Sequence, residues 1–141
     1  MTTEQLTSGL LLLAGVGQIG LAIGSLWIPK ALRWPAQLKN VEPLTRQVFW
    51  TYAAYILVSH LCFGALAIFG RHWLVDGSPL AACVCAFIAV WWLARIVLQF
   101  TAFDRSAAPE GTFYKLAEAV LVAAFVFFGG VHSFAAWLNL Q

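Results

Sequence analysis

The sequence predicts an all-α integral membrane protein whose four transmembrane helices form an up-down-up-down bundle. Of its 141 residues, 62% are hydrophobic and only 10% are charged, whereas soluble domains contain roughly 25% charged residues. A soluble core of this size could not bury so much apolar surface, so we expect the helices to be solvated by lipid. Long apolar segments occupy most of the chain, and short connections separate them. We therefore expect a single transmembrane domain over residues 1–141.

The first two spans are predicted at residues 9–28 and 44–69. From Val48 to Phe69 the chain runs 22 residues without a charged side chain. At ~1.5 Å per residue, a helix of that length crosses the ~30 Å hydrocarbon layer. The connection over residues 29–43 contains three prolines and has apolar residues at helical spacing. We predict a short amphipathic helix at the membrane interface there, with a cytosolic docking surface as the alternative.

The third and fourth spans are predicted at residues 80–103 and 113–138. The third is apolar until Arg95 and Gln99, which are four residues apart and therefore lie on one helix face. The fourth contains Glu118 near its start and His132 further on. A loop over residues 104–112, with a proline and a glycine, separates the two spans.

Lysine and arginine are divided unevenly between the two sides of the expected bundle. The first and third connections, with the span ends next to them, hold six basic residues: Lys30, Arg33, Lys39, Arg46, Arg105 and Lys115. The other side of the bundle holds Arg71 alone. The positive-inside rule then places the basic connections in the cytoplasm and both termini outside. For a bacterial protein this predicts the inner membrane with periplasmic termini.

Glycines in three of the spans are expected to let helices approach closely. Gly20 and Gly24 form a GxxxG pair, a pattern found where helices associate in lipid. A homodimer face and tight packing within one chain both remain open. Gln18, the single strongly polar residue in the middle of this span, is expected to make an interhelical hydrogen bond. The full set of predicted packing glycines is Gly17, Gly20, Gly24, Gly64, Gly129 and Gly130.

Polar side chains recur with the same spacing in the second and fourth spans. Arg46 and His60 are 14 residues apart, as are Glu118 and His132, so each pair lies on one face of its helix. If Arg46 and Glu118 pair at the inner boundary, the two histidines reach the same depth. With two polar residues of the third span, these side chains form a predicted polar seam: Arg46, His60, Arg95, Gln99, Glu118 and His132.

Three interpretations of the two histidines stay open. Each ring could form a hydrogen bond inside the bundle and be structural. Two neutral imidazoles could instead ligate a b-type haem, with the neighbouring glycines leaving room for the porphyrin. The third interpretation is a proton path or polar ligand pocket along the seam.

Two interpretations of Arg95 stay open as well. In one, its guanidinium extends to the cytoplasmic interface or pairs with Glu118. In the other, a site for an anionic headgroup or a quinone headgroup lies near the inner leaflet and is lined by Arg46, Arg95, Gln99 and Trp92. An arginine cannot lose its proton, so either interpretation requires a partner for its charge.

Motifs of known catalytic chemistry are missing from the sequence, including HExxH, a phosphate-binding glycine loop, CxxC and a nucleophile elbow. A net charge of +2 without a basic run does not indicate a nucleic-acid partner, and no ligand set for a metal is visible. We predict a small non-enzymatic protein without catalytic residues or a resident cofactor. It would act as an accessory subunit of a larger membrane complex or as a homo-oligomer, and bind lipid or a small ligand in the seam. A haem-binding anchor of an electron-transfer system, and a transporter or channel protomer, are the alternatives.

Overall fold

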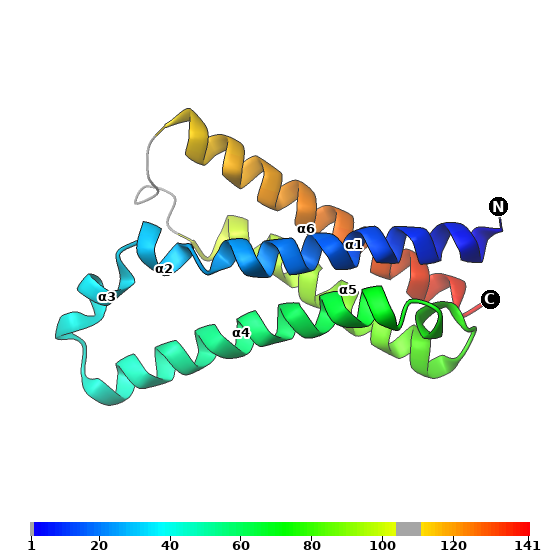
Figure 1. The fold of residues 1–141 in the computed structure, drawn as a ribbon, viewed down its shortest axis with the longest axis horizontal. Helices are drawn as coiled ribbons and strands as arrows, with labels where there is room; N and C mark the ends of the chain where they lie inside the picture. Colours follow the sequence, from blue (N-terminus) through cyan, green and yellow to red (C-terminus); the bar gives the residue numbers. More distant parts are fainter. Residues whose placement is uncertain (1, 104–110) are drawn as a thin grey trace.

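Four long helices dominate the computed structural model of the chain, which describes residues 2–103 and 111–141 (Figure 1). These helices are α1 (Thr3–Ser25), α4 (Pro43–Phe69), α5 (Pro79–Thr101) and α6 (Thr112–Leu138). The remaining elements are short: α2 (Ile28–Ala31), α3 (Trp34–Gln37), η1 (Leu38–Asn40) and η2 (Trp73–Val75). Each long helix is apolar enough to cross a membrane. An all-helical protein with four candidate spans is therefore confirmed. Arg105 and most of the predicted 104–112 loop fall in residues 104–110, outside the described part.

Local capping signals explain where several helices begin. α1 starts ahead of the predicted span because Thr2 and Gln5 form a capping box. The Thr2 hydroxyl accepts from the Gln5 N–H at 3.2 Å, and the Gln5 side chain accepts from the Thr2 N–H at 2.9 Å. α5 is capped by Ser78, whose hydroxyl accepts from the Ala81 N–H at 3.1 Å. Pro43 and Pro79 occupy the first turns of α4 and α5, where a missing N–H costs no hydrogen bond.

The connection between α1 and α4 is broken into short pieces instead of forming one interfacial helix. Arg33 adopts a left-handed conformation with φ of 53°, and the helical turn restarts at Trp34–Pro35. Pro35 has no N–H to donate back to α2, so it stands in the first turn of a new helical segment instead of continuing the old one. The Trp34 ring packs edge-on against Phe49 and Trp50, at centroid distances of 4.9 Å and 5.9 Å. The connection therefore folds against the first turns of α4.

The helices pack as two main pairs, α1 with α4 and α5 with α6, and α1 also contacts α6. Both termini lie at the same end of the molecule as η2, and α4 and α6 diverge toward the opposite end (Figure 1). The buried core, including Leu11, Ile88 and Phe128, lies in the convergent half. The first half of α4 is largely uncovered, with Tyr52 and Tyr55 about two-thirds exposed at 64% and 66%. We call the divergent half, beyond the core, the splayed end.

A buried asparagine fastens the α4–α5 connection to the end of α6. Asn139 donates from its amide to the Leu74 carbonyl at 2.8 Å and to the Ala135 carbonyl at 2.7 Å. Its side-chain oxygen accepts from the Gly77 N–H at 2.8 Å. These three hydrogen bonds are all internal to the protein, so they hold the connection against the end of α6, close to both termini.

Candidate functional site

Polar side chains of α4, α5 and α6 meet near the start of the splayed end. Trp91, Arg95 and Gln99 follow one another at four-residue spacing, so they lie on one face of α5. Trp91 donates from Nε1 to Nε2 of His60 on α4 at 3.3 Å. Gln99 donates from Nε2 to Oε1 of Glu118 on α6 at 3.2 Å. We call Trp91, Arg95, Gln99, His60 and Glu118 the polar ladder. In it, α5 donates one hydrogen bond to α4 and, two helical turns further along, one to α6.

Arg95 lies between the two hydrogen-bonded ends of the polar ladder and is half-buried. Its guanidinium lies over the rings of Phe103 and Phe125, at 5.0 Å and 5.5 Å from their centroids. Cation–π contacts of this kind contribute about 0.5–2 kcal/mol, depending on desolvation. They stabilise the cation but offer its N–H groups no strong acceptor, so an oxygen-bearing ligand could still bind there.

His60 is enclosed by two tryptophans of α5. Its ring stacks on Trp92 with a centroid distance of 4.8 Å and an interplanar angle of 25°, and Trp91 approaches edge-on. Trp92 is fully buried and also packs against Phe125 and Phe128 of α6, at 5.5 Å and 5.0 Å. The Trp92 indole therefore occupies the space between α4 and α6 at the depth of His60.

His132 is placed apart from the polar ladder. It is fully buried, and its Nδ1 lies 2.8 Å from the Phe128 carbonyl oxygen one turn earlier on α6. A carbonyl only accepts, so this contact requires the proton on Nδ1 and leaves Nε2 as an acceptor. Among the described residues, four buried side-chain atoms find no hydrogen-bond partner: His132 Nε2, Trp92 Nε1 and both amide atoms of Gln18. The interhelical hydrogen bond expected of Gln18 is therefore not seen.

The packing around the two histidines does not fit a haem held between them. Ligation through Nε2 of His60 would have to displace the Trp91 N–H that already occupies this nitrogen. It would also have to displace the Trp92 indole that separates His60 from α6. One feature does resemble a metal-binding histidine, namely the Nδ1 contact of His132 with a backbone carbonyl. As packed, however, the two rings are better suited to structural hydrogen bonding.

Arg46 lies in the first turns of α4 and is half-buried. Figure 1 shows this end of α4 and the start of α6 on opposite sides of the splayed end. A pair between Arg46 and Glu118 would require these helix ends to approach, so the pairing stays a prediction. Gln99 of the predicted seam donates a hydrogen bond to Glu118.

The predicted packing glycines divide into two groups. Gly17, Gly64 and Gly129 face other helices, because an added Cβ would lie 2.8 Å from Phe128, 2.8 Å from Ile19 and 3.3 Å from Leu93 respectively. Gly20, Gly24 and Gly130 would accept a Cβ with no atom within 4 Å. The GxxxG pair of α1 is thus turned away from the rest of the described chain.

Trp91 is the site residue that the sequence analysis missed. Its four-residue spacing from Arg95 was a usable signal, but a tryptophan in an apolar run is usually packing surface.

Comparison of the chain with protein-family models, with curated proteins and with solved structures finds no match. Functional inference therefore depends on the geometry of the polar ladder and of the surfaces around it.

Proposed function

We propose that this protein is a non-enzymatic, four-span integral membrane protein that binds a lipid or small ligand at its polar ladder. It would act as a homo-oligomer or as an accessory subunit of a larger membrane complex. The ligand would present an anionic or carbonyl oxygen to Arg95 and Gln99. The observation that supports this best is the Arg95 guanidinium, half-buried inside a candidate span with aromatic faces as its contacts. Charged groups in such positions are costly and commonly mark ligand or ion sites.

The exposed half of α4 supports access to this site from the membrane. Large apolar side chains of α4 are exposed on the splayed end, among them Val48, Tyr52 and Ile56. Apolar surface of this extent in a membrane protein is covered by lipid or by another helix. A lipid could therefore reach the polar ladder sideways between α4 and α6.

The open glycines support association of two copies through α1. Gly20 and Gly24 are on the outside of the chain, beside exposed Ile23 and Trp27. Glycines one turn apart let a second helix approach closely enough for van der Waals contact to drive association in lipid. Gly130 on α6 is equally open but has no second glycine one helical turn away, so it serves as a matched control.

We propose an up-down-up-down topology in which the end with both termini is outside the cytoplasm. The termini lie at one end of the molecule, and Lys30, Arg33 and Lys39 belong to the connection at the other (Figure 1). A reporter active only in the cytoplasm should give a signal when inserted within residues 35–39 and none when fused after Gln141. The reverse pattern would overturn the positive-inside assignment.

Binding at the polar ladder can be tested by purification in mild detergent, followed by mass analysis of retained lipids and quinones. We expect Arg95→Gln to reduce the retained anionic lipid or quinone about tenfold, equivalent to about one charge-assisted hydrogen bond. Lys39→Gln, at an exposed lysine in the connection between α1 and α4, should change nothing. Equal retention by both variants would refute a site at Arg95.

Association can be tested on the same preparations by chemical cross-linking. Replacing Gly20 with leucine should abolish a cross-linked dimer, whereas Gly130→Leu should preserve it. A wild-type protein that is strictly monomeric, and that retains no lipid, would contradict the proposed function as a whole.

A further inference from the structure

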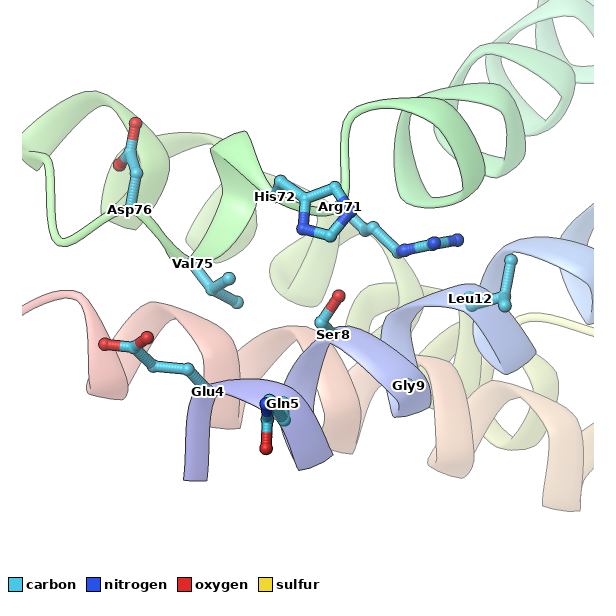
Figure 2. A pocket seen from close by; sticks show the side chains of 9 residues that line it. All are labelled: Glu4, Gln5, Ser8, Gly9, Leu12, Arg71, His72, Val75 and Asp76. Atoms are coloured by element: carbon cyan, nitrogen blue, oxygen red, sulfur yellow. The ribbon is translucent and has the colours of Figure 1, made fainter. Parts of the chain in front are cut away.

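A pocket of about 510 Å³ lies at the end of the molecule that holds both termini, away from the polar ladder. One wall comes from the first turns of α1 and the other from the connection that follows α4 (Figure 2). Its volume falls within the ~300–1,000 Å³ range of small-molecule sites. The residues that determine its chemistry are Glu4, Ser8 and Leu12 on α1, with Arg71, His72 and Asp76 on the connection.

The α1 wall changes from charged to apolar toward the membrane. Glu4, Ser8 and Leu12 are four residues apart and line the pocket together, so they follow one helix face at intervals of ~6 Å. Gly9 contributes no side chain, and a Cβ there would meet nothing within 4 Å, so the floor is open. A ligand lying along this wall would meet a carboxylate first, then a hydroxyl, then an aliphatic group.

The opposite wall places its cation near the apolar end of the α1 wall. Figure 2 shows Arg71 extending toward Leu12 and His72 beside Ser8, whereas Glu4 lies at the other end of the pocket and the Asp76 carboxylate, on the wall across from Glu4, points away from α1. The pocket therefore has an anionic end next to the termini and a cationic end next to the candidate spans. This separation of charge defines the direction in which a dipolar ligand would lie.

Apart from Asp76, the charged groups of the pocket are not engaged by internal contacts. Among the described residues, no hydrogen bond or ion pair engages the side chains of Glu4, Arg71 or His72. Hydrogen bonds from the side chain and the backbone N–H of Ser78 lower the pKa of Asp76, and the backbone bond measures 2.9 Å. Asp76 therefore stays ionised to a lower pH than an ordinary aspartate.

We propose that this pocket binds the zwitterionic headgroup of an ethanolamine phospholipid. Read from water into the membrane, such a lipid presents an ammonium group, a phosphate and then acyl chains. The ammonium would meet Glu4, the phosphate would meet Arg71 and His72, and the first acyl carbons would pass Leu12. Arginine binds phosphate oxygens through paired N–H groups, and an ammonium N–H can donate to carboxylates.

The same geometry discriminates between phospholipids. A glycerol headgroup has the phosphate but no cation, so it would leave the Glu4 carboxylate facing a neutral group. A choline headgroup has the charge but no N–H to donate. We therefore expect the ethanolamine lipid to bind about tenfold more tightly than the glycerol or choline lipid with the same acyl chains, a difference of about one charge-assisted hydrogen bond.

Native mass spectrometry of the delipidated full-length protein in mild detergent tests this proposal, using the three lipids one at a time. Arg71→Gln should weaken binding of the ethanolamine and glycerol lipids together, by about tenfold. Glu4→Gln should remove the preference for ethanolamine while leaving the glycerol lipid bound as before. Lys39→Gln is the matched control, because it removes an exposed charge at the other end of the molecule. Melting temperatures of the variants establish that each is folded.

Three results would overturn the proposal. The first is equal binding of the three lipids to the unaltered protein, and the second is an unchanged lipid preference in Glu4→Gln. The third is displacement of the lipid by soluble glycerophosphoethanolamine at an equal concentration, which would assign the pocket to a soluble ligand. Refutation of the ethanolamine-lipid site would leave the proposal for the polar ladder standing, because Arg95→Gln and Arg71→Gln report on separate sites.

Discussion

Gly15 provides a direct test of how α1 and α4 pack. A Cβ added there would lie 2.8 Å from the Gly64 carbonyl oxygen and 2.8 Å from Cγ1 of Ile68. The isoleucine can rotate away, but the carbonyl cannot move unless α4 itself shifts. Gly15→Ala should therefore force the helices apart, and overpacking of this kind costs about 1–3 kcal/mol. The higher helix propensity of alanine recovers about 1 kcal/mol, so we expect a net loss of up to about 2 kcal/mol.

Gly130→Ala is the matched control for this prediction, because Gly20 belongs to the proposed dimer face. It makes the same change inside the long helix α6, and its Cβ would meet nothing within 4 Å. The difference in free energy of unfolding between the two variants removes the propensity contribution and isolates the steric one, about 1–3 kcal/mol. Unfolding of the purified protein in detergent, followed by circular dichroism, measures both. Equal stability of Gly15→Ala and Gly130→Ala would refute the close approach of α1 and α4.

The remaining predictions concern the buried polar groups. Gln18→Leu should raise the free energy of unfolding by about 1–2 kcal/mol, because it removes a buried amide without a partner; destabilisation in the same assay would mean that the amide has a partner. If Arg46 and Glu118 meet in the membrane, the double variant Arg46→Met with Glu118→Gln should be less destabilised than the sum of the single variants, whereas strict additivity would leave Gln99 as the relevant contact. The purified protein should be colourless after haem-sufficient expression. A Soret band that disappears in His60→Ala and in His132→Ala would instead restore the haem alternative.

Much of the polar ladder could be anticipated residue by residue, but its contacts could not. Periodicity correctly put Arg95 and Gln99 on one face of a helix, because four-residue spacing is a property of the helix itself. The predicted approach of His60 to His132 had no comparable basis. It assumed which helix lies opposite, and the structure instead stacks His60 on Trp92 of α5. The fit of His60 against an indole depends on side-chain shape, which spacing does not encode.

By itself, the sequence determined an all-helical chain with four candidate spans. Apolar length, low charge and proline positions such as Pro43 and Pro79 are local properties that do not depend on neighbouring helices. Only the tertiary structure decided that α1 pairs with α4, that Gly15 is packed while Gly20 is open, and that Glu4 shares a pocket with Arg71. The physical reason is that lipid-facing and protein-facing surfaces of a span are equally apolar. Hydrophobicity therefore gives no preference between neighbours, and complementary shape between distant segments makes the choice.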